Sequence, residues 1–94
     1  MLISELNRFS VEELIEALPD TIRFETGKGT LIIEKRSENF IIYYDNVVNH
    51  SICCSSGYTL KETILELYER LISEKYISVE ATDDNRLNII QLNK

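Results

Sequence analysis

The stretch Gly57–Ile77, GYTLKETILELYERLISEKYI, decides the fold because it predicts one amphipathic helix that leads into a strand. Thr59 is a favourable N-cap residue, and Glu62 stands three residues later, which is the form of a capping box. Apolar residues recur at spacings of three and four, namely Leu60, Ile64, Leu67, Tyr68, Leu71 and Ile72. This spacing places them on one side of a helix over about 59–74, and we expect that side to pack on a sheet.

The first 18 residues predict another helix. Ser10 and Glu13 repeat the capping-box pattern, and Phe9 just before the cap can pack on Leu14 as a hydrophobic staple. Pro19 ends the helix, because proline disfavours helical backbone at the residue before it. We therefore expect a helix over about 2–18, in one or two pieces, with a first turn or two before Ser10.

Between the two helices the apolar pattern changes to a period of two, which is typical of strands. The segments 21–26, 30–35 and 40–47 predict an antiparallel β-meander, with a turn at Gly27-Lys28-Gly29. Residues 48–56 are either irregular or a short extra strand, and 76–92 predict a hairpin that extends the sheet or lies at its edge. The expected fold is a single α+β domain over 1–94, with the order α-β-β-β-α-β-β and a mainly antiparallel sheet packed by two helices.

Two of the predicted strands are apolar on both faces. Leu31, Ile32 and Ile33 are consecutive, and so are the apolar residues from Phe40 to Tyr44. Because side chains alternate between the faces of a sheet, a strand with one buried face would alternate apolar and polar residues. Two arrangements explain the pattern: either a helix lies on each face of the sheet, or one face meets a partner or a second copy of the chain.

The composition narrows the classes of function. The 94 residues carry a formal charge of −6 and a pI near 4.7, and the basic residues are scattered. These features oppose binding of nucleic acid or of an anionic membrane through a broad basic surface. The N-terminus shows no basic segment followed by an apolar one, so we expect a cytoplasmic protein without a secretory signal. The acidity itself serves solubility, a basic partner surface or mimicry of a polyanion.

One cluster of residues could carry chemistry, namely His50, Cys53 and Cys54. A cysteine and a histidine can form a nucleophile and base pair, and such residues can begin a zinc site. A structural zinc site needs four ligands, however, and the chain has a single histidine and no second cysteine pair. We expect no enzyme activity, no cofactor and no metal, and reduced cysteines that act as small apolar side chains.

The candidate interface residues come from the sheet and from the first helix. Tyr43 and Tyr44 must point to opposite faces, and the outward one is the best candidate, since aromatic side chains often anchor interfaces. The acidic residues of the first helix form either a contact surface or simply its solvated side. The full candidate set is Ile32, Ile41, Tyr43, Tyr44, Asp45, His50, Glu12 and Glu16.

One resemblance concerns the C-terminal segment, and a second concerns the order of the elements. The stretch Leu71–Leu92 is similar to the end of the winged helix of MarR-type regulators, through Tyr76-Ile77 and Asp83-Asp84-Asn85-Arg86. That resemblance implies a DNA-binding regulator. The element order also resembles that of type III secretion chaperones, which are small and acidic, and this implies a binding module.

A third resemblance covers most of the chain. The chain is similar to small proteins of unknown function from phages and mobile elements of low-GC bacteria, on Thr59, Glu62, Leu67, Tyr68, Leu71, Ile72, Tyr76 and Ile77. This resemblance implies an accessory protein. We therefore expect a protein–protein interaction function with an unknown partner, in its sharpest form the inhibition of a host or defence protein. A homodimer is a further expectation.

Overall fold

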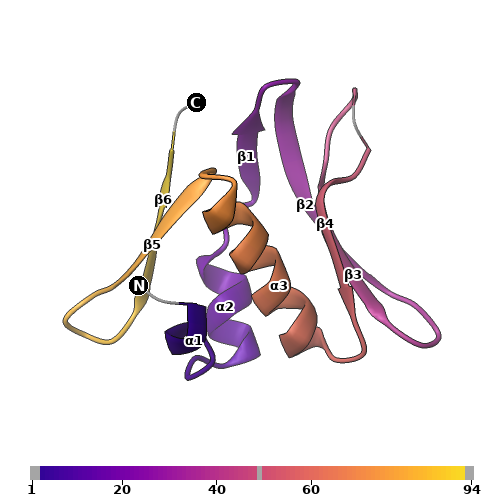
Figure 1. Ribbon diagram of the computed structural model, residues 1–94. Coiled ribbons are helices and arrows are strands. Elements are labelled where there is room, and N and C mark those ends of the chain that lie inside the picture. Colours follow the sequence, from indigo (N-terminus) through magenta and orange to yellow (C-terminus); the bar gives the residue numbers. More distant parts are fainter. Residues whose placement is uncertain (1–2, 49, 93–94) are drawn as a thin grey trace.

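The computed structural model describes residues 3–48 and 50–92 of the chain. Two short helices come first, α1 (Ile3–Leu6) and α2 (Val11–Ala17). Four strands follow, β1 (Thr21–Phe24), β2 (Gly27–Lys35), β3 (Phe40–Asp45) and β4 (Ile52–Gly57). The chain continues with α3 (Leu60–Ser73), β5 (Ile77–Ala81) and β6 (Leu87–Gln91). The predicted α+β class is confirmed, and β4 is added to the predicted order (Figure 1).

Helix α3 forms where the apolar spacing predicts it. The Thr59 hydroxyl accepts the backbone N–H of Glu62 over 3.1 Å, which satisfies one of the unpaired N–H groups at the helix start. The buried side of α3 consists of Thr63, Ile64, Leu67, Tyr68 and Leu71. These side chains form the centre of the core, between the sheet on one side and the N-terminal helices on the other (Figure 1).

The N-terminal segment forms two helices, which is the two-piece arrangement that the sequence left open over 2–18. Ser10 is extended, with φ −71° and ψ 162°, and it caps α2. Both halves of the capping box are present, since Glu13 N–H donates to the Ser10 hydroxyl and Ser10 N–H donates to the Glu13 carboxylate, each over 3.1 Å. The extended cap interrupts the helix, because the Ser10 N–H bonds to the Glu13 side chain and not to a carbonyl oxygen of an earlier turn.

The strands form two separate sheets. One is antiparallel in the order β1-β2-β3-β4, and β5 pairs only with β6. The C-terminal hairpin therefore does not extend the four-stranded sheet. It lies beside β1, where the Gln91 side chain donates to the carbonyl oxygen of Thr21 over 3.0 Å. Residues 52–57 form the extra strand β4, which the sequence left open.

The predicted turn at Gly27-Lys28-Gly29 is displaced. Phe24 pairs with Gly27 and Ile22 pairs with Gly29, so the loop is Glu25–Thr26 and both glycines belong to β2. Gly27 leaves the turn at φ +119°, a conformation that other residues rarely adopt. Gly29 has a different role, because Phe24 packs over it: a Cβ there would lie 2.7 Å from Cε2 of Phe24.

The Gly29→Ala substitution should therefore destabilise the fold by about 1–3 kcal/mol, since the added methyl group overpacks a buried site. The neighbouring Lys28 is exposed and provides the matched control. Lys28→Ala should change the free energy of unfolding by less than about 0.5 kcal/mol. Urea denaturation of both variants measures the difference. Equal stabilities for Gly29→Ala and the parent protein would refute the packing role of Gly29.

The described helices cover one face of the four-stranded sheet. On that face the Tyr44 hydroxyl donates to the Pro19 carbonyl oxygen over 2.8 Å, and the Ser55 hydroxyl donates to the Thr63 carbonyl oxygen over 3.0 Å. Figure 1 shows α2 and α3 on the same side of the sheet, with the β5-β6 hairpin beyond them. The arrangement with a helix on each face of the sheet is therefore wrong for this chain.

Candidate functional site

The uncovered side of the sheet, called the open face below, is defined by the strand register. Residues directly paired between neighbouring strands point to the same face. The pairs Arg23–Lys28, Ile32–Tyr43, Glu34–Ile41 and Thr30–Asp45 share a face opposite to that of Ile42 and Tyr44. The open face consists of Thr21, Arg23, Lys28, Thr30, Ile32, Glu34, Ile41, Tyr43, Asp45 and Ser56.

Three apolar or aromatic side chains lie within the open face. Ile32, Ile41 and Tyr43 are partly buried by their neighbours on the sheet, and no described helix lies over them. The sequence analysis proposed these three residues as interface candidates, and the register brings them together on two adjacent strands. They form a continuous apolar strip across β2 and β3.

A polar network borders this strip. The Tyr43 hydroxyl donates to Oε1 of Glu34 over 2.8 Å, and the Arg36 guanidinium donates to Oε2 over 3.0 Å. The hydrogen bond from Tyr43 is the largest cause that lowers the pKa of the Glu34 carboxyl, and the hydrogen bond from Arg36 is the second. The hydrogen bond to the same carboxylate raises the pKa of Tyr43. Both oxygens of Glu34 are thus satisfied within the chain. A protein that covered the face would not leave this carboxylate unpaired.

Tyr44 does not belong to any exposed surface, so it is removed from the interface candidates. Its side chain is fully buried, and its ring packs near Phe24 with 5.7 Å between the ring centroids. Burial raises the pKa of Tyr44 well above its ordinary value. Of the two adjacent tyrosines, Tyr43 is the one on the open face, because β3 places alternate side chains on opposite faces.

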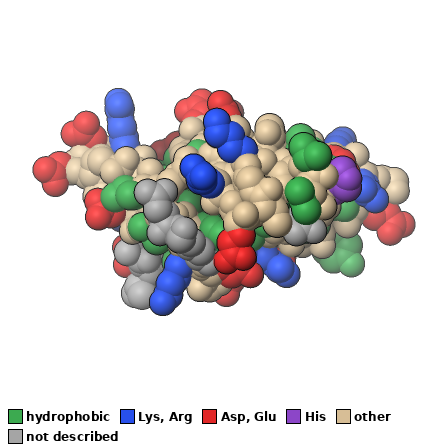
Figure 2. All heavy atoms as spheres, turned by 90° about the horizontal axis from the view of Figure 1, so that it is seen from above, with side chains coloured by type: hydrophobic (Ala, Val, Ile, Leu, Met, Phe, Trp, Pro, Cys, Tyr) green, Lys and Arg blue, Asp and Glu red, His purple; other side chains and the backbone are tan. Residues whose placement is uncertain are grey.

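The loop between β3 and β4 carries an exposed apolar tip formed by Val47 and Val48, called the valine tip below, which the sequence analysis did not single out. Val47 is 93% exposed and Val48 is 67% exposed. Asn46 is buried beneath them and braces the loop, since its amide donates to the Thr26 hydroxyl over 2.7 Å and accepts the Val48 N–H over 3.0 Å. Figure 2 shows hydrophobic side chains standing out beside the single histidine. The feature of the sequence that could have revealed this tip is the pair of valines within a polar loop.

Asp45 and His50, both interface candidates, lie at the base of the same loop. Nδ1 of His50 is 3.4 Å from Oδ1 of Asp45, and both side chains are accessible to solvent. Such an exposed pair contributes little to stability. The Asp45–His50 pair lies between the open face and the valine tip, because Asp45 is the last residue of β3 on the open face and His50 lies in the loop just before β4.

The two cysteines lie on the edge strand β4. Cys53 is partly buried with φ 52°, and its thiol donates to Oε2 of Glu74 over 3.0 Å. Cys54 is exposed. Within residues 3–48 and 50–92, no group of three or more His, Cys, Asp or Glu side chains is arranged to hold a metal ion. Cys53 packs beside the core and contacts Glu74, which is the C-cap residue of α3.

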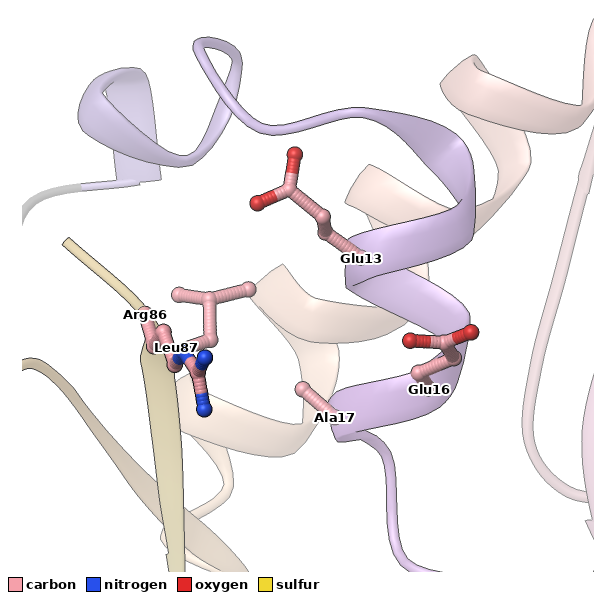
Figure 3. A pocket seen from close by; sticks show the side chains of 5 residues that line it. All are labelled: Glu13, Glu16, Ala17, Arg86 and Leu87. Carbon is pink, nitrogen blue, oxygen red and sulfur yellow. The ribbon is translucent and has the colours of Figure 1, made fainter. Parts of the chain in front are cut away.

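Glu12 and Glu16 lie on α2, away from the open face. Both are exposed, and Glu16 lines a cleft of about 530 Å³ between α2 and the C-terminal hairpin. Glu13, Ala17, Arg86 and Leu87 form the rest of its lining (Figure 3). Among the described residues, Arg86 has no carboxylate within ion-pair distance. The sequence analysis missed this cleft, because its two walls are about 70 residues apart along the chain.

Comparison with known proteins does not identify a role for this chain. No protein-family model, no curated protein and no solved structure matches it. Among the described helices, none has the length and apolar character needed to cross a membrane.

Proposed function

We propose that this chain is a small accessory protein that acts by protein–protein interaction and uses its open face as a binding surface. The observation that carries the proposal is the apolar strip of Ile32, Ile41 and Tyr43, which no described helix covers. A small domain gains stability by burying apolar side chains, so an uncovered apolar strip in the middle of a sheet favours an interface. Tyrosine is also among the residues that most often dominate binding energy.

The chemistry of the strip supports protein as the ligand. Burying an isoleucine side chain fully is worth about 1.5–3 kcal/mol, so two isoleucines and a tyrosine can form the centre of a contact. The surrounding residues Thr21, Thr30 and Ser56 are polar, which suits the rim of an interface. Glu34 is already bonded by Tyr43 and Arg36, so covering the strip leaves this carboxylate paired.

The acidic surface is the second part of the proposal. Helix α2 carries Glu12, Glu13 and Glu16 without a basic residue, and α3 carries Glu62 and Glu69 on its exposed side. Carboxylates repel the phosphates of nucleic acid and attract a basic protein surface. With the resemblance to small phage and mobile-element proteins, this charge favours an inhibitor of a host or defence protein over a DNA-binding regulator.

Site-specific photo-crosslinking in bacterial cells tests the proposed surface. A photoreactive phenylalanine analogue replaces Tyr43 in one variant and Tyr58 in the other. Tyr58 is 81% exposed and belongs to the β4–α3 connection, so it is a matched aromatic control outside the open face. We expect a discrete crosslinked protein product from position 43 and not from position 58. No product from position 43, or equal products from both positions, would refute the assignment of the open face.

A further inference from the structure

We infer that the protein bound at the open face is a second copy of this chain, so that two copies pack sheet against sheet around a two-fold axis. The inference rests on the proposed function, because it names the partner of the same surface. A two-fold interface uses the same patch on both copies, so the patch must tolerate being placed against itself. Two properties of the open face meet this requirement: its charge and the pairing of Glu34 within one chain.

The charge of the molecule is distributed unevenly. The chain has 10 basic and 16 acidic residues. The open face together with Arg36, which bonds to it, holds three of the basic residues and two of the acidic ones, namely Arg23, Lys28, Arg36, Glu34 and Asp45. The remaining seven basic and 14 acidic residues lie elsewhere, so this face carries a formal charge of +1 and the rest of the chain −7.

This distribution favours a second copy over a basic partner. Two chains of net charge −6 repel each other, and contact through α2 would oppose Glu12, Glu13 and Glu16 to one another. The near-neutral open face keeps those carboxylates on the outside of the pair. A strongly basic partner would instead be attracted to the acidic helices and not to a face that contains Arg23 and Lys28.

The polar groups of the open face are compatible with burial. The contacts of Glu34 with Tyr43 and Arg36 are made within one chain, at 2.8 Å and 3.0 Å. Each copy therefore brings Glu34 already paired. Arg23 and Lys28 are paired with each other in the strand register and are both exposed, at the β1 edge of the sheet, so they stay in solvent at the rim of the contact. Ile32 and Ile41 supply apolar area beside it, and two twisted sheets can pack about 10 Å apart with such side chains between them.

The size of the face predicts a weak, reversible dimer. Four strands spaced by about 4.8 Å and about six residues long span roughly 400 Å² in projection. A standard stable interface buries about 800 Å² on each partner. The pair should therefore dissociate on dilution. Because each copy is acidic, added salt should strengthen the pair by screening the repulsion between the outer surfaces.

Sedimentation equilibrium of the full chain tests this inference, from about 1 µM to about 500 µM protein. We expect the mass to rise with concentration from 10.9 kDa towards twice that value. We also expect a larger dimer fraction at about 500 mM than at about 50 mM NaCl. Ile32→Glu should hold the mass at 10.9 kDa, because it places a carboxylate against its own copy in the interface.

Ile33→Glu is the matched control, since Ile33 is the next residue and points to the other face of the sheet, where it is 42% exposed. It should associate as the parent protein does, and thermal unfolding should show both variants folded. The inference is overturned if the parent protein stays at 10.9 kDa throughout, or if both substitutions weaken association equally. A parent protein that stays monomeric but still forms a crosslink from position 43 to a different protein refutes only the second copy as partner. A parent protein that stays monomeric and forms no crosslink from position 43 refutes the proposed function as well.

Discussion

Leu67→Ala should lower the free energy of unfolding by about 2–5 kcal/mol, which is the range for removing a large buried aliphatic side chain. Leu67 is fully buried on α3, and that helix packs on β3 and β4. A domain has about 5–15 kcal/mol of stability in total, so the loss is a large part of it. Urea denaturation followed by circular dichroism measures the change.

Leu92→Ala is the control with the same chemistry. Leu92 follows β6, is 38% exposed and lies outside the core cluster, so its truncation removes less buried surface than at Leu67 and should change stability by less than about 1 kcal/mol. Similar losses for the two variants would contradict the position of α3 at the centre of the core.

The protein should lose stability steeply above about pH 10, because two buried tyrosines must remain neutral in the fold. Burial raises the pKa values of Tyr44 and Tyr68 above their value in the unfolded chain, and their hydroxyls donate to the carbonyl oxygens of Pro19 and Leu14. Their contribution is fully present below the unfolded pKa and is lost as the pH rises towards the folded pKa. Each tyrosine contributes a slope of about 1.4 kcal/mol per pH unit in that window, so the pair contributes about 2.7.

The Tyr44→Phe substitution removes one of the two tyrosines that cause this loss of stability at alkaline pH. At pH 7 the variant should be less stable by about 1–3 kcal/mol, because the Pro19 carbonyl oxygen loses its hydrogen bond. Above about pH 10 the slope of its stability against pH should be shallower than that of the parent by about 1.4 kcal/mol per pH unit. Urea denaturation at a series of pH values measures both quantities. An unchanged slope would show that Tyr44 can ionise within the fold.

The helices and the strand pattern could be predicted because their signals are local. Thr59 with Glu62 and Ser10 with Glu13 mark helix starts through contacts between residues three apart. The stripe from Ile64 to Leu71 likewise depends only on the pitch of the helix. The apolar runs of β2 and β3 correctly indicated that both faces of these strands are apolar, since alternation is a property of the strand itself.

The displaced turn shows where local reasoning stops. Glycines at 27 and 29 are both compatible with a turn, but only Gly27 takes a positive φ. Gly29 is required by the ring of Phe24, a contact across two strands that the spacing of glycines does not reveal. The separate position of the C-terminal hairpin could not be predicted for the same reason, because the sequence pattern of a hairpin does not indicate whether it joins a sheet or at which edge.

By itself, the sequence determined the class of fold, the two helix caps at Ser10 and Thr59, and the apolar strip on β2 and β3, because each follows from residues close together in the chain. Only the tertiary structure decided that α2 and α3 share one face of the sheet, that Tyr44 is buried while Tyr43 faces outward, and that Arg86 lies across a cleft from Glu16. These outcomes depend on which surfaces meet when distant segments pack, and a short-range pattern carries no information on that choice.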